Sequence, residues 1–286
     1  MGEKGRSVYK GSNSGGRLNM TIHFGCQTYT WQMSYEKYKN KLTHILDVIK
    51  QANFQGVEAE VCMLGSFYDD PALLSEELQK RNLQLAALTL ALPWQNSQET
   101  VEEKLETERL LHYLHHFPEA LLILVQLPGQ DRLNLFERQK NGLKCVNDVA
   151  RRAHELGIVS AFHPNSPTGS VFRSAEDYDV MFEGLDTRYV GYCPDSGHIA
   201  NGEMDVLELF KKSRSMIKHV HFKDISQEKE WRTMGEGVID HKSIVNYLIP
   251  SDYNGWIMVE EESKWSESEP DAATKKNGEY IQRSLR

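Results

Sequence analysis

The sequence predicts a single α/β domain, a closed (β/α)8 barrel of the TIM type. Short apolar runs alternate with longer amphipathic stretches along the 286-residue chain, which is the pattern of parallel strands joined by helices. Eight strand candidates occur, each followed by a helix candidate. This number favours a closed barrel, because an open doubly wound sheet usually has fewer strands and a glycine-rich first turn that opens a helix.

The strand candidates are runs rich in Val, Ile, Leu, Phe and Tyr, and polar residues gather mainly at their ends. In chain order they are IHFGCQT (22–28), GVEAEV (56–61), LQLAALTL (83–90), ALLILVQL (120–127), IVSAFH (158–163), YVGYCPD (189–195), IKHVHFKD (217–224) and GWIMVEE (255–261).

The helix candidates are amphipathic, and several begin at Ser, Asp or Pro, which are preferred at helix N-termini. In chain order they are 35–53, 72–81, 98–116, 134–156, 174–184, 204–213, 241–249 and 270–284. The segment MGEGVID (234–240) follows no strand directly and opens no phosphate-binding helix, so we do not interpret it as a dinucleotide-binding turn.

Composition predicts one large domain. Residues 1–19 are rich in Gly, Ser and Lys, so we expect a disordered leader before a barrel that spans residues 20–286. No linker after residue 20 divides the chain, and a hydrophobic content of 40% suits one large core. The net charge of −8 and the scattered Lys and Arg residues argue against nucleic acid as a partner.

Cysteine spacing and hydropathy predict a cytoplasmic protein. Cys26, Cys62, Cys145 and Cys193 form no CxxC pair, and we expect them to be buried thiols in a reducing compartment. No apolar stretch approaches the roughly 20 residues that span a bilayer, and the N-terminus lacks the apolar core of a signal peptide.

Polar residues end four strand candidates in the second half of the chain, where a core would not tolerate them. They are His163, Asp195, His221 and Glu260. Because active sites of such barrels lie at the C-terminal ends of the strands, we expect these side chains to converge. Two imidazoles and two carboxylates suit Mn²⁺, Co²⁺, Zn²⁺ or Fe²⁺ with coordination positions left open.

A single histidine at a strand end is more often a hydrogen-bonded packing residue than a ligand, but four such residues at successive strand ends favour a metal site. Other candidates are weaker. His112, His115 and His116 have helical spacing but should lie on the wet face of an outer helix. Glu261 alternates away from its neighbour on the strand, so we expect it at the surface or behind the ligands.

Several motifs resemble the xylose isomerase-like TIM barrel superfamily of sugar phosphate isomerases and epimerases. They are YCPDSGH, IKHVHFKD, MGEGVID, GWIMVEEES and EPDAATKKNGEYI, while FHPN (162–165) and its spacing to GWIMVE are most similar to the inosose dehydratase branch. The resemblance is close over the second half of the chain and rests on layout in the first half, through GCQTYTW and GVEAE.

The resemblance implies that Asp195, His221 and Glu260 are metal ligands and that His198 contacts the substrate. Strand five departs from the epimerases, which usually carry a glutamate base where this chain has His163, so two-face epimerisation lacks one expected base. The superfamily also includes DNA repair endonucleases with three zinc ions, but LALPW, LVQLP and EKEWRTMGEG contain no additional histidine ligand, which argues against a nuclease.

We therefore expect a metal-dependent enzyme of carbohydrate metabolism, a lyase of the dehydratase type that acts on a keto-cyclitol or 3-keto-sugar. One divalent ion, Mn²⁺ first and otherwise Co²⁺, Zn²⁺, Fe²⁺ or Mg²⁺, would stabilise an enediolate before β-elimination. Glu260 is the expected base. Lys223, with a lowered pKa, and His198 are the candidate general acids. A salt bridge from Lys223 to Asp224 or to another carboxylate is the competing role.

Two alternatives stay open at this point. One is a ketose or sugar-phosphate epimerase or isomerase that uses the same metal site. The other is a barrel that binds a sugar or a partner subunit without turnover, since a fold alone does not establish an activity.

Substrate contacts are expected from two aromatic residues and from polar residues of the strand ends and loops. They are Trp31 and Trp231, whose indole faces suit sugar C–H edges, and Gln27, Glu58, Gln126 and Arg173. The expected partner is a small-molecule keto-sugar or cyclitol, with no nucleic acid and no membrane. A homo-oligomer is compatible with the sequence, which does not determine the oligomeric state.

Overall fold

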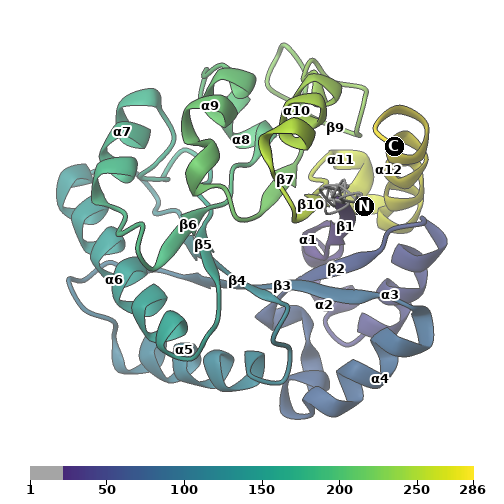
Figure 1. Ribbon diagram of the computed structural model, residues 1–286, viewed down its shortest axis with the longest axis horizontal. Helices are drawn as coiled ribbons and strands as arrows, with labels where there is room; N and C mark the ends of the chain where they lie inside the picture. The colour runs from purple at the N-terminus through teal and green to yellow at the C-terminus, as the bar shows by residue number, and fades with distance from the viewer. Residues whose placement is uncertain (1–21) are drawn as a thin grey trace, which may run out of the picture.

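The computed structural model describes residues 22–286, and eight parallel strands form the centre of the fold (Figure 1). The expected leader, residues 1–19, lies outside the described residues. The strands are β1 (His23–Gln27), β2 (Gly56–Glu60), β3 (Gln84–Leu92), β4 (Leu121–Gln126), β5 (Ser160–Phe162), β6 (Val190–Tyr192), β7 (Val220–Phe222) and β10 (Trp256–Val259).

The strand order closes the sheet into a barrel. Neighbouring strands follow the order β6-β5-β4-β3-β2-β1-β10-β7. Parallel bridges Tyr192↔Ile217 and Asp195↔His221 join β6 to the β7 segment and complete the ring. The predicted (β/α)8 fold class is therefore confirmed.

Eight longer helices surround the strands (Figure 1). They are α3 (Leu42–Gln51), α4 (Pro71–Arg81), α5 (Val101–Leu114), α6 (Leu135–Glu155), α7 (Ala175–Gly184), α9 (Val206–Ser213), α10 (His241–Leu248) and α12 (Pro270–Ser284). Four short helices follow strands β1, β6 and β10 at the C-terminal end of the barrel, namely α1 (Tyr29–Gln32), α2 (Tyr35–Tyr38), α8 (Ser196–Asn201) and α11 (Lys264–Ser268).

Side-chain caps explain several helix starts. Thr100 and Glu103 form a reciprocal capping box at α5, and Ser174 and Asp177 form another at α7. Asp70 accepts the backbone N–H of Leu73 at α4. Such caps satisfy N–H groups that the first turn leaves unpaired and typically stabilise a helix by about 1 kcal/mol.

Two predicted elements are each divided in the structure. The helix expected over 35–53 divides into α2 and α3. The strand expected over 217–224 divides into β7 and a short β8 (Asp224–Ile225), which pairs with an unpredicted antiparallel strand, β9 (Trp231–Arg232).

The MGEG segment wraps around the carboxylate of Asp224, and this arrangement holds the β8–β9 hairpin in place. The backbone N–H groups of Gly235 and Gly237 each donate to Asp224 Oδ2 over 2.9 Å. Gly235 has a φ of +81°, a backbone conformation that favours glycine. The segment therefore positions Trp231 beside the barrel mouth.

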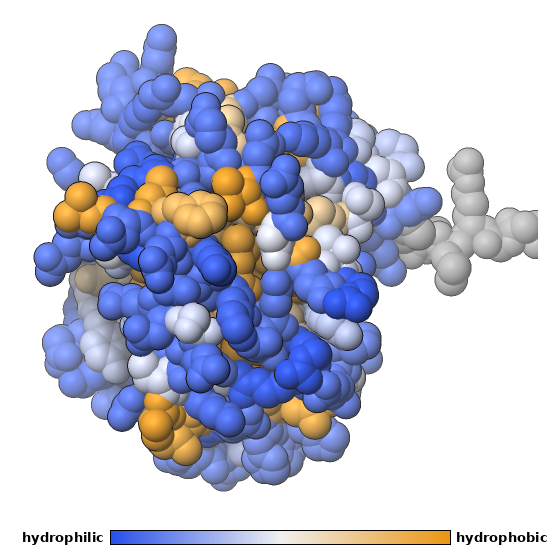
Figure 2. All heavy atoms as spheres, turned by 90° about the vertical axis from the view of Figure 1, so that its left-hand side faces the viewer, coloured by the Kyte–Doolittle hydropathy of each residue, from blue (hydrophilic) through white to orange (hydrophobic). Residues whose placement is uncertain are grey.

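Apolar side chains fill both the barrel and the layer between strands and helices. Ala87, Ile123, Ala161 and Cys193 form a cluster inside the barrel, while a larger core packs the outer faces of the strands against the helices. The face that bears α6 and α7 is mostly hydrophilic, with a small group of hydrophobic side chains near its middle (Figure 2). Within residues 22–286, no helix is both long and apolar enough to cross a membrane.

The cysteine prediction holds for three of the four residues. Cys26, Cys145 and Cys193 are buried free thiols, whereas Cys62 is exposed. Cys62 follows β2 in a short 3-10 turn, where the chain leaves the sheet.

Candidate metal centre

The structure brings together the four residues that the strand ends single out. Ligand atoms of His163, Asp195, His221 and Glu260 all lie within 4.8 Å of one another, and all four side chains are buried. His163 and Glu260 directly follow β5 and β10 and remain bonded to the neighbouring strands, through N–H groups that donate to Leu124 O (2.9 Å) and Phe222 O (3.0 Å). Barrel closure therefore converts four distant positions into one cluster.

The cluster has donor atoms that suit a divalent cation. Both ring nitrogens of His163 and Oδ2 of Asp195 are buried without a hydrogen-bond partner among the described residues. His163 Nε2 lies 3.7 Å from Asp195 Oδ2. Because buried polar atoms almost always have a partner, these atoms fit a metal ion better than a packed core.

Glu58 lies inside the barrel behind His221. Its Oε2 is 2.9 Å from His221 Nε2 and 2.7 Å from His219 Nε2, and its Oε1 accepts from Thr89 Oγ1 over 2.7 Å. Burial opposes ionisation of Glu58, but His221 and His219 outweigh it and hold the pKa of this carboxyl well below its usual value. Glu58 is thus an anion that hydrogen-bonds to two imidazoles, so its carboxylate is not directed at a substrate.

This anion determines which nitrogen of His221 can act as a ligand. Hydrogen bonding of Nε2–H to Glu58 leaves Nδ1 of the same ring directed at Glu260, whose Oε2 is 2.9 Å away. A carboxylate behind a histidine is the usual way in which proteins orient a metal ligand. The candidate donor set therefore consists of His221 Nδ1, His163, Asp195 and Glu260.

Lys223 is a buried cation at the edge of the cluster. Its Nζ donates to Glu260 Oε1 (2.9 Å) and to Glu262 and lies 3.8 Å from Asp195 Oδ2. Burial alone would lower the pKa of Lys223, but the surrounding carboxylates of Glu260, Glu262 and Asp195 raise it well above its usual value. The protein groups by themselves therefore raise this pKa, and the ion-pair partners are Glu260 and Glu262 and not Asp224.

His198 is neutral and contacts Lys223. Burial, and then the charge of Lys223, lower the pKa of His198 to about 3. Its Nδ1 lies 2.8 Å from Ser166 Oγ and its Nε2 lies 3.2 Å from Lys223 Nζ. A neutral ring with Nδ1–H donating to the serine accepts from the ammonium at Nε2, so His198 orients Lys223.

The two tryptophans expected to contact substrate lie in different environments. Trp231 is half-buried, and its ring lies 5.1 Å from Lys223 Nζ and 5.5 Å from the His198 ring, so it borders the cluster. Trp31 is fully buried and donates from Nε1 to Asp271 Oδ1 over 2.8 Å, which turns its polar edge toward α12.

Gln27, Gln126 and Arg173 form hydrogen bonds to neighbouring segments of the chain, and Arg173 does so through its backbone. Gln27 Oε1 accepts the backbone N–H of Tyr29. Gln126 points outward from β4 to α6, where it approaches Gly142 and donates to Trp94 O over 3.3 Å. Arg173 precedes α7, and its backbone N–H donates to the capping carboxylate of Asp177 over 3.1 Å.

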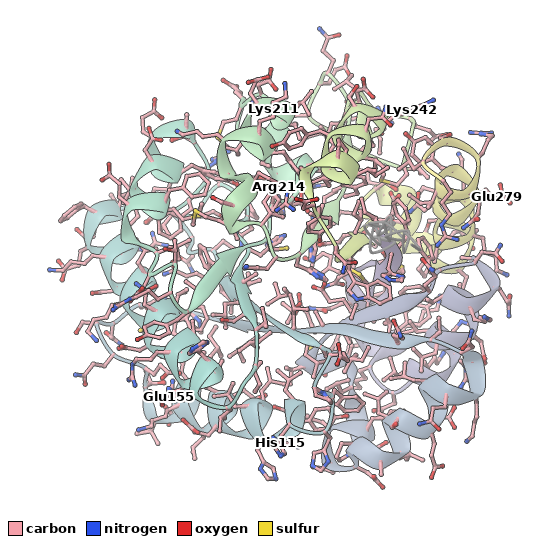
Figure 3. All side chains as sticks on the ribbon, in the orientation of Figure 1. His115, Glu155, Lys211, Arg214, Lys242 and Glu279 are labelled. Atoms are coloured by element: carbon pink, nitrogen blue, oxygen red, sulfur yellow. The ribbon has the colours of Figure 1, made fainter. Side chains whose placement is uncertain are left out.

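The predictions for the weaker candidates are partly corrected. His112, His115 and His116 are exposed, and Figure 3 shows His115 pointing outward from the rim of the molecule, as expected for an outer helix. Glu261 is buried and not at the surface. It accepts from Asn277 Nδ2 over 2.9 Å and from the Ser263 N–H over 3.2 Å, so it joins β10 to α12.

Three residues of the barrel mouth were missed at the sequence level. Burial raises the pKa of Glu60 to about 7, with Glu260 and Glu58 adding to the shift, and Gln32 Nε2 donates to it over 2.8 Å. Burial likewise raises the pKa of Glu262 to about 7. Burial raises the pKa of Tyr29 to about 12, and the charges of Glu262 and Glu260 add to this shift. Period two from Glu58 and Glu260 would have found both glutamates.

Comparisons with known proteins find relatives by sequence and neighbours by fold. The inosose dehydratase of Bacillus velezensis is 28% identical over 256 residues, which cover 78% of this chain and 82% of the relative. The crystal structure of the IolI protein with a bound zinc atom has a TM-score of 0.74 at 14% identity, covering 91% of this chain and 96% of that one. The 3-keto-D-glucoside 4-epimerase YcjR of E. coli has a TM-score of 0.71 at 15% identity, with coverage of 92% and 99%.

Structural likeness at these sequence identities establishes the fold alone, whereas a match to a family model also establishes family membership. The model of the xylose isomerase-like TIM barrel family matches residues 46–284. This range includes all four residues of the candidate metal centre and seven of the eight barrel strands. The chain therefore belongs to the xylose isomerase-like TIM barrel family.

Proposed function

We propose that this protein is a divalent-metal-dependent lyase that dehydrates a keto-cyclitol or a 3-keto-sugar, with 2-keto-inositol as the nearest template. The curated relatives named inosose dehydratase, which match most of the chain, support this substrate class. The observation that carries the proposal is His163, whose unpaired imidazole completes the cluster where a second carboxylate base would otherwise stand.

His163, Asp195, His221 and Glu260 would hold the ion. Nitrogen and carboxylate donors suit several metals, and we expect Mn²⁺ first, with Zn²⁺ as the main competitor because the structural neighbour IolI holds zinc. When bound, such an ion polarises the carbonyl of a keto-sugar and so acidifies the neighbouring C–H group.

Two side chains, Glu260 and Lys223, then carry out the proton transfers. Glu260 accepts the α proton, the C–H electron pair forms the new double bond, and the bond from the β carbon to its hydroxyl oxygen breaks. Lys223 gives the departing oxygen a proton, so water leaves. Since Lys223 Nζ and Glu260 Oε1 are 2.9 Å apart, the proton gained by Glu260 can return to Lys223 and restore both groups.

The product of the metal-loaded protein tests this proposal. We expect incubation with 2-keto-inositol or with a 3-keto-glucoside to yield a diketone or an enone with loss of water or alcohol, which mass spectrometry and ultraviolet absorption detect. A clean epimer without elimination would contradict the lyase. Deuterium exchange at the α carbon without elimination would favour the epimerase, and a protein that retains no divalent metal would favour a binding role.

Replacing Glu58 with glutamine is expected to weaken metal binding by about 10-fold to 100-fold, because the amide no longer offers an anion to the two imidazoles and His221 loses its fixed orientation. Competition with a chromophoric chelator measures this affinity. Glu261→Gln is the matched control, since Glu261 is also a buried carboxylate but bonds to Asn277 and not to the cluster. Equal affinities for the two variants would refute this role of Glu58.

A further inference from the structure

A cleft of about 630 Å³ adjoins the metal centre and has no role in the reaction described above. It lies between the β8–β9 hairpin and the segment around α11, which occupy neighbouring positions beside α12 (Figure 1). Trp231 and Glu262 line it, and both also contact Lys223. The cleft therefore lies on the outer side of two side chains that contact Lys223.

An indole side chain stands on the outer wall of this cleft. Trp265 is 39% exposed, a large apolar surface for a side chain beside an active-site mouth. Lys276 Nζ lies 5.3 Å from its ring centroid. With Trp231 on the inner wall, the cleft carries two indoles, and flat aromatic faces of this kind pack against the C–H edges of sugar rings.

The charges of the cleft favour a neutral ligand over a phosphate. Three of its cations already have carboxylate partners, in the pairs Lys276–Glu236, Arg232–Glu230 and Lys229–Glu203. Glu262 adds a further carboxyl, and Lys264 is the remaining cation of the lining. An anion would have to compete with these carboxylates, whereas hydroxyl groups can bond to paired ions as donors and as acceptors.

We infer that this cleft is a subsite for a second, neutral carbohydrate ring that is linked to the reacting keto ring. This inference rests on the proposed function and narrows its substrate class to keto-glycosides with two rings. The reacting ring lies at the metal centre, Lys223 stands at the boundary, and the second ring packs between Trp231 and Trp265. The volume suits one sugar ring with its bound water.

Kinetic selectivity tests the subsite on the metal-loaded full chain. The ratio of kcat/KM for a 3-keto-disaccharide to that for 2-keto-inositol is expected to fall about tenfold in Trp265→Ala, mainly through KM, and to fall less in Trp265→Phe. Phe136→Ala, which removes an exposed aromatic ring from α6, is the matched control and should leave the ratio as it is. An unchanged ratio in Trp265→Ala overturns the inference, as does a larger loss for a 6-phosphorylated one-ring substrate.

Binding without turnover separates this inference from the proposed function. The unoxidised disaccharide cellobiose should show saturation-transfer NMR signals on one ring with the wild-type chain, and these signals should weaken in Trp265→Ala but not in Phe136→Ala. This result supports the subsite even if neither keto substrate is converted. Equal signals for all three proteins, or stronger binding of glucose 6-phosphate than of cellobiose, would refute it even if dehydration is observed.

Discussion

Removal of the divalent metal is expected to abolish turnover and to lower the melting temperature by several degrees. Without an ion, His163 and Asp195 keep buried donor atoms that have no partner within residues 22–286, and the anions Asp195 and Glu260 lose the counter-charge of the metal. A ligand present at 1,000 times its Kd stabilises a folded protein by about 4 kcal/mol. For a domain of this size, that energy corresponds to roughly 7 °C.

This prediction is tested by measuring metal content, activity and thermal unfolding before and after chelation. The same measurements are repeated after Mn²⁺, Co²⁺, Zn²⁺ or Mg²⁺ is added back. His163→Ala should reproduce the effect of chelation by weakening metal retention, whereas His115→Ala, which alters an exposed histidine at the end of α5, should not. Full activity in a preparation shown to be metal-free would exclude the proposed mechanism. The order in which the four ions restore activity would identify the preferred metal.

Replacing Lys223 with methionine is expected to lower kcat by about 10²-fold to 10⁴-fold, the usual contribution of a positioned proton donor. Methionine fills a similar space but cannot protonate the departing oxygen. The variant should also unfold at a lower temperature, because removing one partner of a buried ion pair typically costs about 3–5 kcal/mol, and here Glu260 and Glu262 lose the cation that they share.

Metal content separates loss of the proton donor from collapse of the site. Lys223→Met should retain the divalent ion, since Lys223 is not one of its ligands, while activity falls. Lys144→Met serves as a control, because Lys144 forms a solvent-exposed pair with Asp148 on α6 and should change neither activity nor stability appreciably. Activity of Lys223→Met within tenfold of wild type would remove Lys223 from the mechanism.

The candidate ligands could be predicted from the sequence because the strands of the barrel are parallel. In a (β/α)8 barrel every strand ends at the same rim, so polar residues at strand ends must converge there. His163, Asp195, His221 and Glu260 satisfy this rule, and the structure brings their donor atoms within 4.8 Å. The family resemblance was carried by the same strand ends.

The direction in which a side chain points was harder to predict from the sequence, as Gln126 illustrates. The run ALLILVQL is apolar on both faces, as expected of a barrel strand that packs inward on other strands and outward on helices. The alternation of polar and apolar residues therefore could not indicate whether Gln126 faces the inside of the barrel or the surrounding helices. In the structure Ile123 packs inside the barrel, and Gln126, three residues later, faces α6.

The sequence by itself determined the eight barrel strands, their parallel arrangement and the residue types at their C-terminal ends, because hydrophobic periodicity and local turn chemistry act over short segments. Only the tertiary structure decided the roles of Glu58 and Lys223. Glu58 meets His221 across a separation of 163 residues, and Lys223 meets Glu260 across 37. The charge state of such groups depends on burial and on partners that strand pairing alone brings together.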